Sequence, residues 1–553
     1  MKIKIRPLVF WPSFILLIAA VLLSIFNLDK FASTLSAVTV WSMKFFGSGY
    51  ELVTVIMMAV CIAICFMPFG RVKIGGSKAK PEYGLFAYFT MCLAMTVAIG
   101  ILFWGALEPI FHITQPPASL KIEPGSPEAA IFAMSTIFLH WTFTPYAIYG
   151  VPTVMFAFAY YNMKKSFTIS SMLSPILSDE KVNGRVGQVV DSVILFAMVC
   201  GVANTLGVGT MTVNGGLRTV FGIDGSAVLN FIVCFGIVAA FIVSAIMGIT
   251  DGLKNLARLN FYIFLFLLGW VIVFGTPLFC VNIGLEGFGN FMDNFFQKNL
   301  FTGAAAQDEW PVWWTIWYYA IWMAWAPVSG IFLGRISYGY KVRTVIGINV
   351  FLSALFSVVW FTFFSGQAIH MQLFENINLG EVLATQGNDM VTYAFFGGLP
   401  LSNIISSIFV ITAIITYVAG SDAMCSTLAG LSSFGISPDN PEAKPWLKIV
   451  WGVMLGAVAW ITMTFAGLDG LKSLSNLGGI PTLIILIPIT WCLIKVAKNP
   501  WKYDTFKEDY DEYGQPLREK VNVLLKSEFE EYVQPKMECD VKAESHAKRV
   551  STS

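Results

Sequence analysis

Aromatic side chains recur at helical spacing in one apolar stretch of the chain. The rings follow at intervals of three or four residues, at Trp314, Tyr318, Trp322 and Trp325. At 100° per residue they fall within about 80° of one another on a helix. Aromatic faces attract cations and suit a quaternary ammonium, which cannot donate a hydrogen bond. An interfacial aromatic belt is the alternative interpretation, but the stripe runs about three turns deep, which favours a cavity for an organic cation.

A second aromatic set lies earlier in the chain, between His140 and Tyr149. It comprises Trp141, Tyr146 and Tyr149, which spread over about 140° of an ideal helix. Pro145 removes a backbone hydrogen bond among them, and a bend there would turn all three rings toward one cavity. The two stretches together predict an aromatic box.

The elements that position these rings are expected to be membrane-spanning helices. The chain has 553 residues, of which 56% are hydrophobic and 12% are charged. Its apolar runs exceed the roughly 20 residues that a spanning helix needs. The predicted fold class is therefore an all-α polytopic membrane protein. We expect twelve spans, near 9–27, 51–69, 85–107, 130–161, 189–213, 227–249, 256–278, 311–334, 344–370, 397–433, 447–468 and 474–496.

Charge in the connecting segments predicts the orientation of the spans. Lys and Arg concentrate in the loops on the same side as the N-terminus, and cationic loops are retained in the cytoplasm. Both termini are therefore expected to be cytoplasmic. The first apolar segment shows no small-residue cleavage site, so we interpret it as a retained span rather than a signal peptide.

Beyond residue 497 the composition changes to charged and poorly hydrophobic, with slightly more acidic than basic side chains. Such a tail is expected to be partly disordered and to have no strong attraction for anionic lipid. The chain thus divides into an N-terminal region (1–84), a first helical region (85–278), an extracytoplasmic connection (279–310), a second helical region (311–496) and a charged tail (497–553).

Residues for an enzyme or a metal centre are scarce. The four histidines form no His-x-x-x-His pair, and no nucleophile motif is present. The nine cysteines lie mostly within the spans, where they act as small apolar packing residues. We therefore expect no catalysis, no cofactor, no metal and no nucleic acid partner.

Several segments resemble the betaine/carnitine/choline transporter family. These segments run from Trp314 to Trp325, from Ile331 to Gly339, from Gly100 to Pro109 and from His140 to Tyr149. The similarity extends over nearly the whole chain except the tail. The resemblance implies a LeuT-like fold with two inverted five-helix repeats, spans 3–7 and 8–12, and the substrate between them at the midplane. It also implies a homotrimer in a cell inner membrane.

The resemblance maps a substrate box onto Trp141, Tyr146, Tyr149 and Trp322, with Trp325 one turn further along the path. Tyr146 takes a place that Trp often holds in the family. Ile321 replaces a Trp that commonly precedes the residue at Trp322. The box is therefore complete in aromatic residues but altered in shape.

Ion coupling is where the chain departs from sodium-coupled members of that family. Sodium-coupled members resemble one another in a pair of hydroxyl residues that helps to bind sodium. The corresponding residues in this chain are Ala419 and Gly420, just before Ser421 and Asp422. Neither Ala419 nor Gly420 offers a side-chain oxygen, which a hard cation needs. Lys254 matches an arginine that stands in for sodium in the sodium-independent exchangers. A loop lysine that snorkels to the interface is the alternative interpretation.

These features favour sodium-independent exchange of trimethylammonium compounds by alternating access. The expected substrates belong to the carnitine, γ-butyrobetaine and glycine betaine class. Sodium- or proton-coupled uptake of glycine betaine or choline is the alternative, with Asp422 and Glu108 as acids near membrane depth. Glu108 precedes Pro109 at an expected span end, where it would serve as a cap or loop anchor. A membrane osmosensor is an alternative of another class.

Overall fold

The computed structural model describes residues 4–96, 98–247, 250–375, 377–437, 440 and 442–517. The helices of the described part are joined by turns and loops, and its two strands are a short antiparallel pair, β1 (Lys4–Ile5) and β2 (Ser433–Phe434), in which Lys4 faces Phe434. The helices are α1 (Pro7–Phe26), α2 (Leu28–Phe66), α3 (Leu85–Thr96), α4 (Ala98–Thr114), α5 (Pro127–Trp141), α6 (Phe143–Ala157), α7 (Asp179–Asn183), α8 (Arg185–Phe221), α9 (Ala227–Met247), α10 (Thr250–Phe274), α11 (Pro277–Asp293), α12 (Phe295–Asn299), α13 (Trp310–Trp313), α14 (Thr315–Ile336), α15 (Val342–Ile346), α16 (Ser353–Phe374), α17 (Leu379–Gln386), α18 (Asn388–Gly397), α19 (Ser402–Leu431), α20 (Pro445–Lys498) and α21 (Pro500–Tyr503).

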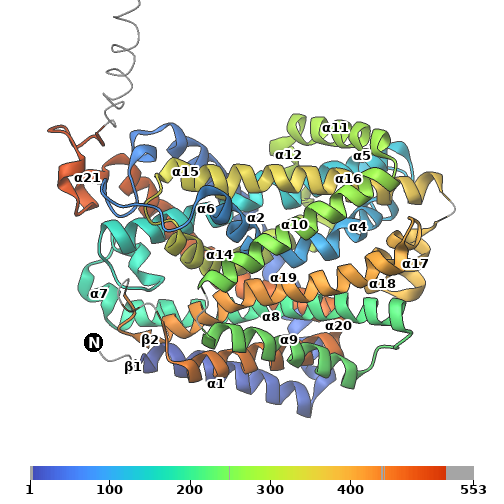
Figure 1. The fold of residues 1–553 in the computed structure, drawn as a ribbon, viewed down its shortest axis with the longest axis horizontal. Helices are drawn as coiled ribbons and strands as arrows, with labels where there is room; N and C mark the ends of the chain where they lie inside the picture. Colours follow the sequence, from blue (N-terminus) through green and yellow to red (C-terminus); the bar gives the residue numbers. More distant parts are fainter. Residues whose placement is uncertain are drawn as a thin grey trace, which may run out of the picture.

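The long helices lie against one another in a single bundle. Figure 1 shows α8, α9, α19 and α20 running alongside each other, while α10 crosses the bundle obliquely. Within the described residues, eight helices are long and apolar enough to span a membrane, or nine if the bent pair α3 and α4 forms one span. The prediction of a polytopic helical fold agrees with this architecture. The count of twelve spans and the two inverted repeats stay predictions.

Several of the expected spans differ in detail from the helices that the structure describes. The apolar part of α1, Pro7–Leu23, is shorter than a full span. The spans expected near 447–468 and 474–496 both fall within α20, which is interrupted at Gly467 by a non-helical, positive φ of 60°. Only glycine adopts that backbone conformation at low cost.

The span expected at 130–161 is divided into α5 and α6. The division falls at Thr142, whose φ and ψ of −120° and −131° leave the helical region. The prediction that Pro145 bends this segment is wrong in position. Pro145 is the third residue of α6, where its missing N–H removes no intrahelical hydrogen bond. Trp141 therefore ends one helix, whereas Tyr146 and Tyr149 belong to the next.

Close packing of α14 on α6 brings the two aromatic stretches together. A Cβ at Gly330 would lie 2.8 Å from Cβ of Pro152, and one at Gly334 would lie 2.9 Å from the carbonyl oxygen of Thr153. Small residues allow helix backbones to approach in this way inside membranes. The two glycines, one turn apart, fix α14 against the helix that carries Tyr146 and Tyr149.

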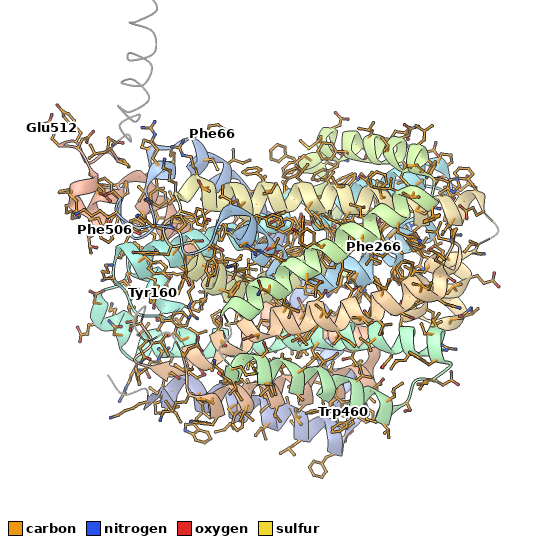
Figure 2. All side chains as sticks on the ribbon, in the orientation of Figure 1. Phe66, Tyr160, Phe266, Trp460, Phe506 and Glu512 are labelled. Atoms are coloured by element: carbon orange, nitrogen blue, oxygen red, sulfur yellow. The ribbon has the colours of Figure 1, made fainter. Side chains whose placement is uncertain are left out.

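The outer surface of the bundle carries many apolar side chains. Figure 2 labels Phe66 and Phe266 on peripheral helices, and both rings are more than half exposed. Exposed apolar surface of this kind marks contact with lipid or another protein. It fits a chain whose spans are surrounded by a bilayer.

The beginning of the charged tail packs on loops of the helical bundle. Asp504 is buried, and its carboxylate accepts hydrogen bonds from the side-chain amide of Asn162 at 2.9 Å and the hydroxyl of Tyr510 at 2.7 Å. Burial raises the pKa of the Asp504 carboxyl. The ammonium of Lys164 lies 4.8 Å from the ring centre of Phe506. Residues 518–553 of the expected tail lie outside the described residues.

Candidate functional site

A cavity in the middle of the bundle is lined by aromatic rings from α4, α5, α6 and α14. Four of the five predicted box residues line it: Trp141, Tyr149, Trp322 and Trp325. The other lining residues are Ala94, Met95, Thr96, Gly100, Trp104, Asn204, Thr205, Val208, Tyr318, Ile321, Thr416, Tyr417, Gly420 and Met424. The lining is mostly apolar, with hydroxyl and amide groups in its wall, as small-molecule sites generally are.

Trp322 is the centre of the ring cluster. Its ring centre lies 5.7 Å from that of Trp141, 5.5 Å from that of Tyr146 and 4.9 Å from that of Tyr149. Tyr146, the fifth predicted residue, is buried behind Trp322 rather than in the cavity lining, and its hydroxyl is 2.9 Å from that of Ser357. Tyr146 thus supports the box from behind.

The fold places Trp141 with little freedom. A Cβ at Gly100 would lie 2.4 Å from the Trp141 ring, so only glycine fits opposite this indole. On its other side, the indole N–H of Trp141 donates to the carboxylate of Glu108 at 2.6 Å. The ring is therefore held from both sides.

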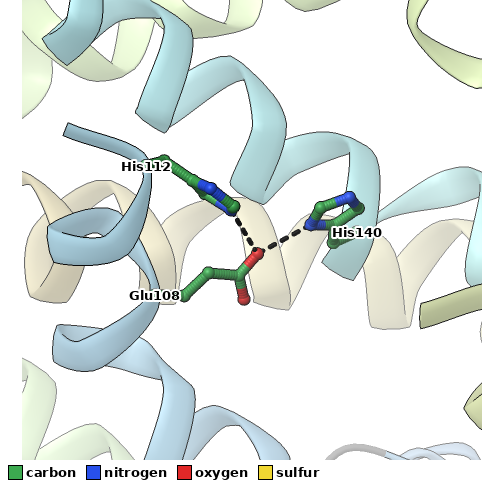
Figure 3. Close-up of side chains that lie close together, drawn as sticks. All are labelled: Glu108, His112 and His140. Atoms are coloured by element: carbon green, nitrogen blue, oxygen red, sulfur yellow. Dashed lines mark hydrogen bonds and ion pairs between the residues drawn. The ribbon is translucent and has the colours of Figure 1, made fainter. Parts of the chain in front are cut away.

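Glu108 is the hydrogen-bond centre of the site. One carboxylate oxygen accepts from Trp141 and from the hydroxyl of Tyr318. The other oxygen lies 2.7 Å from Nδ1 of His140 and 3.2 Å from Nε2 of His112, as Figure 3 shows. All of these side chains are buried. The prediction that Glu108 is a cap or loop anchor is wrong, because α4 continues to Thr114 and the carboxylate lies inside the bundle.

Glu108, His112 and His140 are also a group that could hold a metal ion, since their ligand atoms lie within 4.8 Å of one another. Their direct hydrogen bonds account for the arrangement without an ion. A buried carboxylate needs donors on both oxygens, and the two rings supply them on one side. Sequence reasoning missed this cluster because His140 lies far from Glu108 along the chain. The four-residue spacing of Glu108 and His112 was its only local signal.

Ala419 and Gly420 border a small gap in the packing that is too narrow for a water molecule, together with Met91, Ala94, Met95, Ala257, Phe332 and Ala423. All of these side chains are apolar. Lys254 lies half-buried in α10, three residues before Ala257 and so on a neighbouring part of the helix surface. Asp422 is buried and accepts a hydrogen bond from Ser244 at 2.7 Å. The roles predicted for Lys254 and Asp422 stay predictions.

A buried aromatic cavity enclosed by membrane-length helices defines a multi-pass membrane transporter rather than an enzyme. The chain belongs to the betaine/carnitine/choline transporter (BCCT) family, whose sequence model matches residues 8–502.

Three characterised relatives are similar over most of the chain. A glycine betaine transporter, OpuD of Bacillus subtilis, is 29% identical over 87% of this chain and 92% of its own. An ectoine/hydroxyectoine transporter of Virgibacillus pantothenticus is 28% identical over 84% and 91%. A high-affinity choline transport protein of Escherichia coli is 28% identical over 90% and 73%. Among solved structures, a manganese transporter mutant of Eremococcus coleocola matches 82% of this chain and 87% of its own, with a TM-score of 0.41 at 10% identity.

Proposed function

We propose that this transporter carries trimethylammonium compounds and holds their head group in the aromatic box. The observation that carries the proposal is the convergence of Trp141, Tyr149 and Trp322 on one buried cavity. Desolvated rings attract a quaternary ammonium by about 2 kcal/mol or more. The names of the relatives include glycine betaine and choline, which share this head group. Carnitine and γ-butyrobetaine belong to the same proposed class.

The proposed mode of transport is sodium-independent exchange by alternating access. The residues around Ala419 and Gly420 support it, because their side chains are apolar and closely packed, whereas sodium is bound by oxygen atoms. Lys254 is the proposed substitute for the ion. It lies on α10, three residues before Ala257, which is packed beside Ala419 and Gly420. We also propose that the chain has twelve spans in two inverted repeats, that both termini are cytoplasmic, and that the protein forms a homotrimer in a bacterial inner membrane.

Sodium- or proton-coupled uptake is a second candidate, and two buried side-chain oxygen atoms favour it. Oδ1 of Asn204 and Oγ of Ser421 are buried without a hydrogen-bond partner among the described residues. An unsatisfied buried oxygen is costly, and a bound cation would satisfy it. Asn204 also lines the central cavity.

Uptake into proteoliposomes tests both candidates. Labelled γ-butyrobetaine, carnitine and glycine betaine would be offered to vesicles with or without internal unlabelled substrate, and with or without a sodium or proton gradient. Exchange requires internal substrate and ignores both gradients. Gradient-driven uptake into empty vesicles would establish coupled transport. If none of the three compounds entered under any condition, the proposed function would be wrong.

A further inference from the structure

A partly buried lysine lies beside one wall of the substrate cavity. Lys472 belongs to α20, five residues after the break at Gly467. Its ammonium lies 4.6 Å from the ring of Trp317, 4.8 Å from that of Trp314 and 5.8 Å from that of Trp104. Three rings around one ammonium form a cation–π cage. Of the three, Trp104 also lines the substrate cavity.

Two acids attract the charge of Lys472, and neither forms an ion pair with it among the described residues. Both Asp469, which is exposed on the same helix, and Glu108, which is buried, attract the ammonium electrostatically. Glu108 lies behind other parts of the cavity wall, where its carboxylate accepts hydrogen bonds from Trp141 and Tyr318. The rings of Trp104 and Tyr318 are 5.9 Å apart. A positive and a negative side chain thus stand behind neighbouring parts of one aromatic wall.

Opposite charges in this arrangement match a zwitterion. The negative charge of Glu108 is hydrogen-bonded to Trp141, one of the rings proposed to hold the ammonium head. Lys472 stands behind Trp104, where it attracts an acidic end group. Charges in a membrane interior are weakly screened and act beyond direct contact. Choline has the same head but a neutral hydroxyl end, so it gains nothing from the lysine.

We propose that Lys472 is a specificity-determining residue that favours zwitterionic substrates, with an ammonium head and a carboxylate end, over choline. This inference rests on the proposed function, because it assumes that the head group binds in the aromatic box. It assigns the carboxylate selectivity to a lysine that lies between the spans expected at 447–468 and 474–496.

Equilibrium binding of labelled glycine betaine and labelled choline to the full-length protein tests the proposal. The ratio of the two dissociation constants is compared between the wild type and Lys472→Met. We expect the preference for glycine betaine to fall about tenfold, through weaker binding of glycine betaine. Tenfold corresponds to about 1.4 kcal/mol, which opposite unit charges provide at about 12 Å when the effective dielectric constant is about 20.

Two further variants separate charge from packing. Lys472→Arg keeps the charge and should keep the wild-type ratio. Lys507→Met removes another ammonium, 4.7 Å from the Trp501 ring in the docked start of the tail and outside the lining of the substrate cavity, and should leave the ratio unchanged. If Lys472→Met does not assemble, Lys472→Gln gives the same comparison with a polar end group.

An unchanged ratio in a folded Lys472→Met protein would overturn the proposal, as would an equal loss of affinity for both ligands. Either result leaves the proposed function intact, because the wild type still binds its ligands. If the wild type bound neither compound, both the proposed function and this assignment would be wrong.

Discussion

The carboxylate of Glu108 accepts a hydrogen bond from the indole N–H of Trp141 at 2.6 Å. The same carboxylate bonds Tyr318, His112 and His140. One buried charge therefore sets the orientation of two rings in the cavity wall. A ring bound in this way is preorganised for its ligand, which lowers the cost of binding.

Replacement of Glu108 by Gln is expected to weaken substrate binding. The amide would present N–H groups to side chains that now donate, so at least one buried donor loses its acceptor. We expect an affinity loss of about tenfold, corresponding to about 1.4 kcal/mol, measured by binding of labelled glycine betaine. Glu375→Gln is the matched control, since Glu375 also accepts from a histidine, His370 at 2.8 Å, but lies outside the cavity lining. Equal affinities of the Glu108→Gln and Glu375→Gln variants would show that Glu108 does not contribute to substrate binding.

Truncation of Trp322 should weaken substrate binding. Loss of one desolvated cation–π partner is expected to cost about 2 kcal/mol, or about 30-fold in affinity. Trp322→Ala would be measured against Trp41→Ala, because the Trp41 ring is largely exposed on α2. Wild-type affinity in an assembled Trp322→Ala protein would refute the aromatic box.

Addition of a single methyl group at Gly100 should displace the ring of Trp141. The new Cβ would lie 2.4 Å from the indole, a distance that requires the ring or the helix to move. We expect weaker binding in Gly100→Ala and unaltered binding in Gly236→Ala, at which a Cβ would meet no described atom within 4 Å. Thermal unfolding of both variants shows whether the effect is confined to the site.

Loss of the Lys254 ammonium should impair exchange if this side chain replaces a transported ion. The readout is exchange of labelled γ-butyrobetaine in proteoliposomes by Lys254→Gln. Lys44→Gln is the control, since Lys44 is an exposed lysine that pairs with Glu309. Full exchange by Lys254→Gln would indicate that this lysine only reaches the membrane interface. Exchange that now depended on sodium would support the proposal that the ammonium takes the place of a sodium ion.

The docked start of the tail is expected to loosen as pH rises. Burial raises the pKa of Asp504 above its value in the undocked chain, so the docked form is favoured while the carboxyl is protonated. This contribution is full below the undocked pKa and is lost as pH rises through the docked pKa. Hydrogen exchange of residues 499–517 over that range measures the effect. Asp504→Asn should remove the pH dependence of hydrogen exchange. If the variant kept the wild-type pH dependence, another titrating group would be responsible for it.

The sequence predicted the stripe on α14 because neighbouring turns of one helix bring Tyr318, Trp322 and Trp325 to one face. The spacing of these residues along the chain is sufficient to predict that they share one face of a helix. The Glu108 cluster was not predictable in the same way, because its partners lie on three helices and their contacts depend on tertiary packing. Lys472 was missed for a different reason. It lies just before the expected span at 474–496, and α20 extends past both ends of that span.

The segment around Tyr146 illustrates a further limit of sequence patterns. The role of Tyr146 in the substrate box stays a prediction: its ring centre lies 5.5 Å from that of Trp322, and it is not among the residues that line the cavity. The break at Thr142 rather than at Pro145 decides which way α6 presents its residues. Proline was the visible signal, whereas the helix is interrupted at a threonine that no local sequence pattern marks.

The break at Thr142 separates Trp141 from Tyr149, so a ligand held by both rings bridges two helices that share no continuous backbone ladder. Part of the ligand's binding energy is then used to hold these segments together. If α5 and α6 move relative to one another during transport, a ligand that binds tightly to both helices slows that movement. The compound that binds most tightly need not be the one carried fastest.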